Sequence, residues 1–494
     1  MLALLVAVLA GDQPAKTPQP PNIVFLLADD LGYGDLGCFG QTIIRTPNLD
    51  RLATEGVKLT RHYAGNPVCA TSRCVLMTGR HPGHAFIRDN LKWEPEGQYP
   101  IPDETVTLAE VLSDTGYVCG GFGKWGLGGP DTEGQPNVQG FDRFFGYNCQ
   151  RIAHSFYPAY LRVDGQRFPL DNPPVPGHAK LRPDEDPDDV ASYERFTGDD
   201  YAPDLISAQA RAFIRQSAGR PFLMYYPTTV PHLALHVPDD SLAEYTDVIT
   251  DDPPYPGGKG YTPHRRPRAA YAAMITRMDA EIGRILGLLE ELGLTDNTIV
   301  VFSSDNGPTY DRLGGSDSEF FDSAGGLRGL KGSMYEGGVR VPTIVRWPGL
   351  TQAGAESDAL SGFEDWMPTL AAAAGADPTP GDGIDLRPVL RGDDETGRDF
   401  LYREFPGYGG FQAVWSGPWK AIRTDVTRKR TASKPLRTEL YDLSADRAET
   451  TDVASDHPDV LTRLEAIMAR EHAPSVLFPM PKLDADSASA KSSE

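Results

Sequence analysis

Four stretches of nearly continuous apolar residues each end in a polar or glycine-rich turn. They are "NIVFLLADD" (22–30), "YVCGGFGKW" (117–125), "PFLMYYPTT" (221–229) and "NTIVVFSSDNG" (297–307). Such a run is typical of a strand buried on both faces of a parallel sheet. Because parallel strands present their carboxyl ends at one edge, we expect the four polar ends to gather there.

Helical patterns separate these predicted strands. Between 271 and 289 the apolar residues follow the i, i+3, i+4, i+7 rule and stop at Gly293, and 204–214 forms a second helix with Asp204 near its cap. Strands that alternate with helices predict an α/β fold, with a large domain whose mainly parallel central sheet is flanked by helices.

The pattern changes after Pro348. A helical segment at 364–376 leads into a Pro/Gly/Asp-rich connector, and "FQAVWSGPWKAIR" (411–423) and "TELYDLSAD" (438–446) look like strands. We therefore predict a smaller C-terminal α+β domain with an antiparallel sheet and a closing helix at 459–471. The predicted boundaries are a leader at 1–20, a catalytic domain at 21–395, the smaller domain at 396–480 and a disordered tail at 481–494.

Length, charge and the first residues narrow the class of protein. A chain of 494 residues with a net charge of −22 lacks the basic footprint that nucleic acid requires, although it can still bind small anions. The apolar run 2–10 resembles a secretory signal and is too short to span a bilayer. It lacks basic residues at its start, so a frayed apolar terminus remains the alternative. We expect a periplasmic or secreted protein without a membrane span.

The five cysteines are too sparse for a disulfide scaffold. No CxxC or His-spaced pair indicates zinc. Cys74 and Cys119 suit buried apolar positions, whereas Cys38 and Cys149 could pair or remain free. The odd count suggests that at least one of the five has a separate role.

Two polar pairs end predicted strands that lie far apart in the sequence. They are Asp29-Asp30 and Asp305-Asn306. Each pair alone is compatible with an ordinary turn capped by Asp or Asn. Together at one sheet edge, three carboxylates and an amide favour a hard cation such as Ca²⁺ or Mg²⁺.

Four cationic or titratable residues also fall near predicted strand ends or in glycine-rich loops. They are Arg73, Lys124, His232 and Lys331. Separately, each is more often a surface charge or a hydrogen-bonded histidine. Together with a bound cation they describe a pocket that binds a tetrahedral oxyanion and stabilises the charge that develops during its transfer.

The stretch "PVCATSRCVLMTGRHPGH" (67–84) resembles the signature of the type I, formylglycine-dependent sulfatases, which is Cys-x-Pro-Ser-Arg followed by Thr-Gly-Arg. Further similar motifs run from Pro21 to about Ala473, including "GKWGLG", "QGFDRFFGY" and "GLRGLKGSMYEGGVRVP". The resemblance, to arylsulfatase A-like enzymes, implies the alkaline phosphatase superfamily fold and sulfuric ester hydrolase activity.

The resemblance also implies roles for individual residues. Cys69 would be oxidised by a formylglycine-generating enzyme to an aldehyde, whose hydrate attacks sulfur and later expels sulfate. Arg73 would steady the hydrate, and Lys124, Lys331 and His232 would hold the sulfate and its leaving oxygen. One Ca²⁺ would be held by Asp29, Asp30, Asp305 and Asn306, with the modified Cys69 touching the metal.

Two positions depart from the family pattern. Thr71 stands where the maturation enzyme favours proline, so conversion of Cys69 could be inefficient. Gly126 stands where many members have a histidine beside the hydrate. His154, in the loop after the "GFDRFFGY" segment, is a candidate replacement because an imidazole suits a base near neutral pH. The alternative is a surface-loop histidine that packs on Tyr157.

We expect a sulfated carbohydrate as the substrate. Loops 84–100, 150–200 and 232–268 would select the sugar, with His84, Arg88, Asp89 and Asn90 as possible contacts and His236 at the rim. The basic "HRRPR" cluster at 264–268 could contact an anionic sugar or simply begin a helix. Two other functions remain open: a metal-dependent phosphatase or phosphodiesterase that uses Thr71 or Ser72, and a non-catalytic glycan-binding relative.

Overall fold

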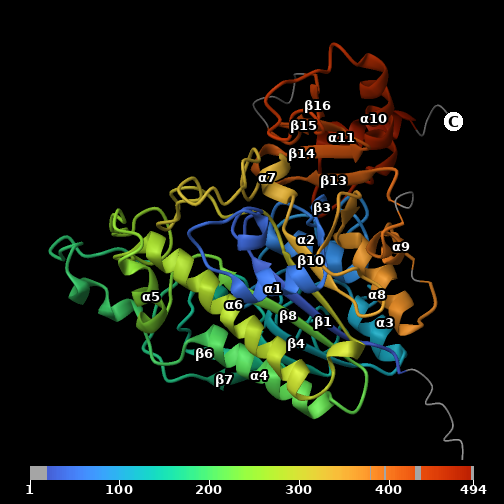
Figure 1. The fold of residues 1–494 in the computed structure, drawn as a ribbon. Helices are drawn as coiled ribbons and strands as arrows, with labels where there is room; N and C mark the ends of the chain where they lie inside the picture. Colours follow the sequence, from blue (N-terminus) through green and yellow to red (C-terminus); the bar gives the residue numbers. More distant parts are fainter. Residues whose placement is uncertain (1–18, 379, 394–396, 429–434, 491–494) are drawn as a thin grey trace, which may run out of the picture.

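The computed structural model describes residues 19–378, 380–393, 397–428 and 435–490 (Figure 1). The predicted leader falls largely on residues 1–18, which lie outside this described part. Within the described part, none of the helices combines the length and the apolar character that a membrane crossing requires.

A ten-stranded sheet forms the centre of the large domain. Its order is β11-β2-β10-β9-β1-β8-β4-β5-β6-β7. Five neighbouring strands run parallel: β9 (Thr298–Ser304), β1 (Asn22–Asp29), β8 (Phe222–Pro231), β4 (Val118–Lys124) and β5 (Arg143–Tyr147). The four predicted strands are therefore adjacent, which confirms the α/β fold.

Shorter strands extend the sheet on both sides. They are β2 (Val57–Leu59), β6 (Tyr160–Val163), β7 (Gln166–Pro169), β10 (Thr343–Arg346) and β11 (Ala355–Ser357). Strand β10 is antiparallel to both of its neighbours, and β5, β6 and β7 form an antiparallel series. The sheet is mixed as a whole, with a parallel centre. Short strands β3 (His62–Tyr63) and β12 (Ser361–Gly362) form a separate pair.

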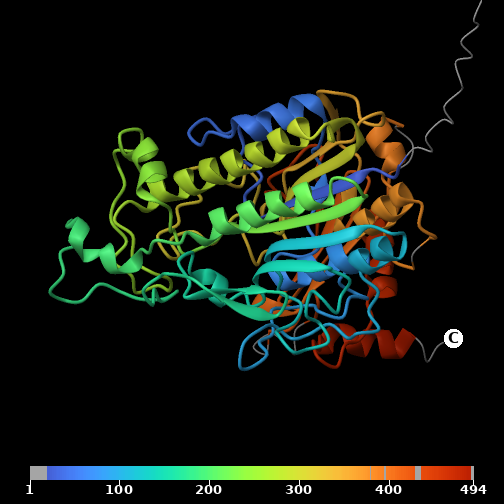
Figure 2. The ribbon, with the colours of Figure 1, turned by 90° about the horizontal axis from the view of Figure 1, so that it is seen from below.

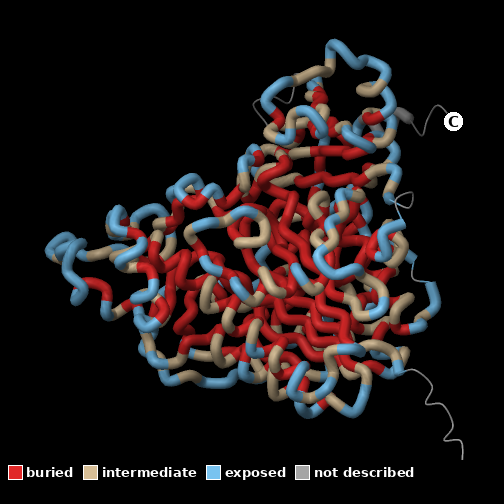
Figure 3. Tube along the Cα trace, in the orientation of Figure 1, coloured by how far each residue is buried: buried red, intermediate tan, exposed pale blue. Residues whose placement is uncertain are grey.

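Helices cover both faces of the sheet. Successive side chains of β1 point to opposite faces and enter two separate hydrophobic cores. Val24 and Leu26 face a layer made by α1 (Pro47–Glu55), α4 (Ala202–Ser217) and α6 (Pro267–Glu291). Phe25 and Leu27 face α2 (Cys69–Thr78), α3 (Leu108–Asp114) and α8 (Trp366–Ala374). Figure 2 shows α6 lying along one face, and Figure 3 shows the buried chain running through the sheet.

Helix α2 carries the candidate nucleophile on its first turn. All ten of its residues are buried, so no side of the helix faces solvent. The helix ends at Gly79, whose φ of 64° places it in the left-handed region while its N–H bonds to the Val75 carbonyl. At its other end the first residue, Cys69, contacts Asp29 at the carboxyl end of β1.

The smaller domain has the predicted antiparallel sheet. Its strands are β13 (Leu401–Phe405), β14 (Phe411–Ser416), β15 (Trp419–Thr424) and β16 (Thr438–Asp442). Helix α10 (Pro458–Glu471) packs on this sheet through Leu464 and Met468. Shorter helices elsewhere are α5 (Asp239–Thr246), α7 (Glu336–Val339) and α9 (Arg387–Arg391).

The predicted disordered tail is wrong for most of its length. Residues Pro481–Ala490 form helix α11. Met480 and Leu483 pack with Val426 beside the small sheet, and Asp484 accepts a hydrogen bond from the Met480 amide. Two apolar residues were too few to give a pattern in an Asp/Ser/Ala-rich sequence, and residues 491–494 lie outside the described part.

Candidate active site

The two predicted ligand pairs meet at the carboxyl edge of the sheet. Strands β1 and β9 are parallel and in register to Ala28 and Ser304, so the residues that follow them are neighbours. The Asp30 amide donates to Asp305 Oδ1 at 3.1 Å, and Asn306 Nδ2 donates to Asp30 Oδ1 at 2.8 Å. Asp29, Asp30, Asp305 and Asn306 are each at most 1% exposed.

Cys69 lies directly against these carboxylates. Its Sγ is 3.3 Å from Asp29 Oδ1 and 3.9 Å from Asp30 Oδ1. Burial, together with the charges of Asp29 and Asp305, raises the pKa of the Cys69 thiol well above its usual range. The sulfur is therefore a neutral thiol at pH 7. Side-chain atoms of Asp29, Asp30, Cys69 and His232 lie within 4.8 Å of one another, a spacing that could hold a metal ion.

Two buried lysines approach the sulfur from different elements. Lys124 ends β4 and places Nζ 2.6 Å from Asp29 Oδ2 and 3.4 Å from Cys69 Sγ. Lys331 places Nζ 2.6 Å and 2.8 Å from the two Asp30 oxygens and also 3.4 Å from Sγ. Burial opposes their charge, but the facing carboxylates outweigh it and raise the pKa of both lysines. Both ammonium groups therefore face the position of the nucleophile.

Arg73 lies one turn along α2 and is fully buried. Its Nε and Nη2 both donate to Asp305 Oδ2, at 3.0 Å and 2.8 Å, and Nη2 is 3.5 Å from Asp29 Oδ2. It also donates to the backbone carbonyl of Lys124. This guanidinium therefore joins the ends of β9, β1 and β4 in one hydrogen-bonded group.

Two stacked histidines complete the group. His232 Nε2 is 3.6 Å from Asp30 Oδ2, and its ring stacks on His154 with centroids 5.0 Å apart and planes at 17°. Among the described residues, the other ring contacts of His154 are His178 and Tyr261, and Tyr157 is not one of them. Burial lowers the pKa of His232 to about 4 and that of His154 much further, so both rings are neutral at pH 7.

One residue that the sequence analysis missed stands next to Gly126. An ideal Cβ at Gly126, whose φ is 90°, would lie 2.8 Å from Gln150 Nε2. The Gln150 side chain therefore occupies the space where a side chain at position 126 would begin. A glycine replacing a bulky family residue was the signal that could have directed attention to a neighbour filling that space.

Most of the predicted sugar contacts bind other parts of the protein. Arg88 is buried and donates to Glu404 Oε1 at 2.7 Å, and His84 Nδ1 is 2.9 Å from Asp382 Oδ1. Asn90 differs, because its Oδ1 accepts a hydrogen bond from the Ala70 amide at 3.2 Å, next to Cys69. Within the basic cluster, Arg268 pairs with Asp317 at the start of α6.

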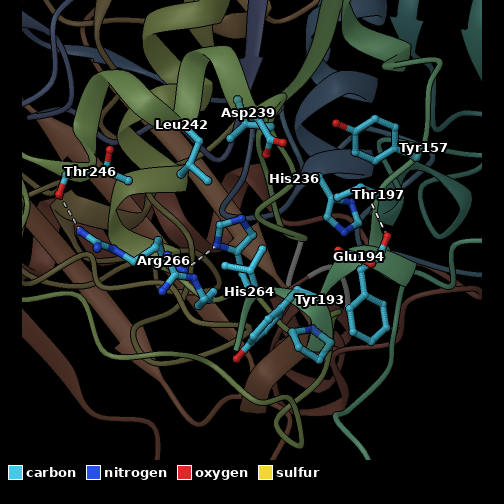
Figure 4. Close-up of a pocket in the computed structure, with 15 residues that line it drawn as sticks. Tyr157, Tyr193, Glu194, Thr197, His236, Asp239, Leu242, Thr246, His264 and Arg266 are labelled. Atoms are coloured by element: carbon cyan, nitrogen blue, oxygen red, sulfur yellow. Dashed lines mark hydrogen bonds between the residues drawn. The ribbon is translucent and has the colours of Figure 1, made fainter. Parts of the chain in front are cut away.

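Two cavities lie in the loops around this sheet edge. One, of about 710 Å³, is lined by Asn90, Gln150 and His154 among others and adjoins the site. The other, of about 320 Å³, is lined by aromatic residues and by His236 and His264, and it contains none of the charged groups around Cys69 (Figure 4). His236 is 3% exposed, its Nε2 lies 2.8 Å from Thr262 Oγ1, and it lines this second cavity and not the one beside Cys69.

The structure also shows whether Cys38 and Cys149 form a disulfide. Cys38 and Cys149 are free thiols, as are the other three. Cys74 and Cys119 lie in the apolar core between the sheet and α2, α3 and α8, as predicted.

The mixed sheet between two helical layers, with a separate antiparallel sheet, is an alkaline-phosphatase-like fold. At the level of fold alone, the structure is similar to phosphonate monoester hydrolase of Agrobacterium radiobacter, with a TM-score of 0.59, 22% identity and coverage of 91% of this chain and 96% of that one. A family profile described as sulfatase matches residues 21–376, and one described as N-sulphoglucosamine sulphohydrolase, C-terminal, matches 330–472. The chain belongs to the sulfatase family, and the enzyme is a sulfuric ester hydrolase.

Individual relatives cover nearly the whole chain. Arylsulfatase A of Homo sapiens is 35% identical over 94% of this chain and 90% of its own length. N-acetylgalactosamine-6-O-sulfatase of Bacteroides thetaiotaomicron is 31% identical, with 92% and 93% covered. The structure of Ps i-CgsB in complex with k-i-k-neocarrahexaose has a TM-score of 0.72 at 26% identity, with 92% of each chain covered. The family resemblance in the sequence is therefore confirmed.

Proposed function

We propose that this enzyme hydrolyses sulfate monoesters of a sulfated carbohydrate at a formylglycine formed from Cys69 beside a bound Ca²⁺. The observation that carries the proposal is the position of Cys69 Sγ, 3.3 Å from Asp29 and 3.4 Å from both Lys124 and Lys331. The carbohydrate is supported by relatives named N-acetylgalactosamine-6-O-sulfatase and N-acetylgalactosamine-6-sulfatase and by a solved neighbour in complex with k-i-k-neocarrahexaose.

The ligand set fits Ca²⁺ on its chemistry. Asp29, Asp30 and Asp305 offer carboxylate oxygens, which hard cations prefer. Asn306 Oδ1 is buried and has no hydrogen-bond partner, although its Nδ2 is bonded twice. An acceptor left unpaired among three carboxylates suits a cation better than another protein donor. When bound, Ca²⁺ supplies positive charge against the sulfate oxygens, and the aldehyde hydrate at position 69 supplies the attacking hydroxyl.

The side chains around Cys69 have separable tasks. Lys124 and Lys331 bind sulfate oxygens and offset the negative charge that builds up on them. His232 Nδ1 faces the Leu233 carbonyl, which fixes the ring and directs Nε2 toward the site. With Nδ1 donating to that carbonyl, Nε2 of the neutral ring is a proton acceptor, so His232 would first take up a proton and then pass it to the leaving ester oxygen. His154, stacked behind it, is a second neutral imidazole and the proposed base in place of a residue at position 126.

The phosphatase alternative would use the hydroxyl of Thr71 or Ser72 as the nucleophile, and both hydroxyls are hydrogen-bonded to other residues. Thr71 Oγ1 accepts a hydrogen bond from Asn66 Nδ2 at 2.9 Å, and Ser72 Oγ accepts from the Gly65 amide at 3.0 Å. Both residues are fully buried in α2. Neither is among the groups that converge on the carboxylates. The presence of both lysines also argues for catalysis over simple glycan binding.

The test begins with maturation. Protein produced together with a formylglycine-generating enzyme is digested, and the peptide bearing Cys69 is examined by mass spectrometry for the aldehyde. The same preparation is assayed on a panel of position-defined sulfated monosaccharides and oligosaccharides. We expect sulfate release that depends on the aldehyde and on Ca²⁺. Two bound zinc ions with faster hydrolysis of phosphate monoesters would overturn the proposal, and so would turnover by protein with an intact thiol.

The cellular location and the domain boundary at 395/396 stay predictions. A secreted or periplasmic protein would be recovered outside the cytoplasm with its first residues removed, which N-terminal sequencing of the mature protein tests.

A further inference from the structure

The cavity of about 710 Å³ adjoins the site on two sides. On one side Asn90 accepts a hydrogen bond from the Ala70 amide, which directly follows Cys69. On the other side His154 stacks on His232. Because two of its lining residues contact residues of the site, this cavity is the candidate space for a group attached to a sulfate held at Cys69.

Two buried polar atoms of the residues lining the cavity have no partner. Gln150 is 5% exposed and its Nε2 has no acceptor, while Gln98 is 6% exposed and its Oε1 has no donor. Buried polar groups in proteins are almost always hydrogen-bonded, so such exceptions indicate a ligand or ordered water. One unpaired donor and one unpaired acceptor match the dual character of sugar hydroxyls.

The position of the Gln150 amide depends on Gly126. An ideal Cβ at residue 126 would lie 2.8 Å from Nε2, so any side chain there would displace the amide. Gly126 is two residues beyond Lys124, whose ammonium lies 3.4 Å from Cys69 Sγ. Because of this glycine, a neutral donor lines the cavity close to the charged groups that face Cys69.

The rim of the same cavity carries an aromatic ring and two cations. Trp93 is 41% exposed, and Tyr99 meets its ring edge-on with centroids 5.2 Å apart. Lys92 and Arg151 also line the cavity. An apolar ring face near convergent polar groups is typical of a site for a small polyhydroxylated ligand.

We propose that this cavity binds the sugar that bears the sulfate ester, and that Gln150 Nε2 donates a hydrogen bond to one of its hydroxyl oxygens. This inference rests on the proposed function and names the part of the substrate that Gln150 recognises, which is the leaving alcohol and not the sulfate. Gln150 is then a specificity-determining residue.

The test compares two classes of sulfate ester. Matured Gln150→Ala is assayed on the best sulfated monosaccharide of the panel and on p-nitrophenyl sulfate, whose leaving group has no sugar hydroxyls. Loss of one hydrogen bond predicts a fall in kcat/KM of about tenfold on the saccharide beyond any fall on the aryl ester. Gln150→Glu, which keeps the shape and loses the donor, should fall similarly. Gln216→Ala on the exposed side of α4, outside the loops expected to select the sugar, is the control and should match the wild type.

A double-mutant cycle separates the amide from its surroundings. Gly126→Ala should lower saccharide turnover because its methyl displaces Gln150, and the double variant should lose little more than either single variant. Equal falls on both substrates would overturn the proposal, as would no fall on the saccharide. Thermal unfolding of each variant checks that the fold is intact.

Binding measurements keep this test independent of turnover. The unsulfated monosaccharide is titrated into wild type and Gln150→Ala by calorimetry, and weaker binding to the variant is expected. If the matured wild type hydrolyses no sulfate ester, the proposed function fails, while equal sugar binding by the two proteins overturns the cavity assignment.

Discussion

Among the buried clusters of charge in the described part of this chain, two are built alike, and only one of them has the features of an active site. The first is the group around Cys69, where Arg73, Lys124 and Lys331 face three aspartates. The second lies where α7 meets the small sheet, where Lys420 Nζ is 3.1 Å from Glu336 and 2.7 Å from Glu449. Both clusters are fully buried and both pair opposite charges.

Their titration behaviour is also alike. In the first cluster, burial and the neighbouring Asp29 raise the pKa of Asp305 to about 6. In the second, burial and the neighbouring Glu336 raise the pKa of Glu449 to about 7, whereas Lys420 and Arg340 outweigh burial and lower that of Glu336 to about 2. A perturbed pKa at a buried ion pair therefore does not by itself identify a catalytic group.

The two clusters differ in which hydrogen-bond partners their polar atoms have. Around Glu336, Trp415 Nε1 donates to one oxygen at 2.7 Å and Tyr63 Oη donates to the other at 2.8 Å, so protein donors surround the carboxylate. Around Cys69, Asn306 Oδ1 has no protein partner, whereas Glu449 Oε1 in the second cluster lacks a hydrogen bond but lies 2.7 Å from Lys420 Nζ. A cavity lies beside each cluster, lined by Asn90 and His154 near the first and by Arg340 near the second. A thiol between two ammonium groups and an amide oxygen without any protein partner, and not burial, charge or a nearby cavity, distinguish the site. The predictions below test this distinction.

The largest expected effect is the loss of turnover in Cys69→Ala. Removing the group that forms the nucleophile should lower kcat by at least about a thousandfold. The aspartates and lysines keep their pairing, so the unfolding transition in denaturant should remain cooperative with a similar midpoint. Sulfate release measured on the matured protein checks the first part, with Cys74→Ala on the same helix as the control. Turnover close to wild type in Cys69→Ala would mean that the nucleophile lies elsewhere.

How much of this difference could be predicted depends on where the residues stand in the sequence. Asp29-Asp30 and Asp305-Asn306 directly end apolar runs, so the strand pattern alone brought them together. Glu336 follows a glycine-rich loop, Lys420 lies inside a strand and Glu449 lies in a turn, and no periodicity connects them. Gln150 was missed because its importance depends on contact with Gly126, which only the folded chain shows.

The second cluster should control stability instead of catalysis. Lys420→Met leaves Glu336 and Glu449 together without their ammonium group, which should lower the free energy of unfolding by about 3–5 kcal/mol. The kcat per folded molecule should stay at the wild-type value. Urea unfolding and an active-site-normalised assay measure the two quantities. Arg437→Met, which removes an exposed pairing with Asp452, is the control and should cost at most about 1 kcal/mol. A fall in kcat comparable to that of Cys69→Ala would remove the distinction between the clusters.

Removal of the metal should affect only the cluster around Cys69. Removal of Ca²⁺ with a chelator should lower sulfatase activity by about a hundredfold, because binding of the sulfate then relies on the lysines alone. Calcium should restore the activity, and Asn306→Ala should need more calcium than wild type because it lacks one ligand oxygen. Isothermal titration with Ca²⁺ measures the affinity directly. Activity that resists chelation while no calcium is found by elemental analysis would contradict the metal assignment. Lys420→Met should keep the wild-type calcium affinity.

The smallest expected effect concerns the histidine pair at the junction with the C-terminal region. His81 Nε2 lies 3.1 Å from Glu471 Oε2, and His84 Nδ1 lies 2.9 Å from Asp382 Oδ1. The hydrogen bond to Asp382 raises the pKa of His84. A folded pKa above the unfolded one stabilises the protein at pH values below the unfolded pKa, and this contribution is lost as pH rises through the folded pKa.

The pairing of His84 with Asp382 is partly exposed, so its effect on stability should be about 0.5 kcal/mol. His84→Ala should be less stable than wild type at pH 5.5, and the gap should narrow toward pH 8.5. Urea unfolding across this range measures the gap, with His457→Ala on the surface near Trp419 as the control. A gap that widens with pH would show that His84 acts through packing. Because His84 takes no part in the group around Cys69, kcat should not change, which separates a titrating ion pair at a domain junction from one that faces the substrate.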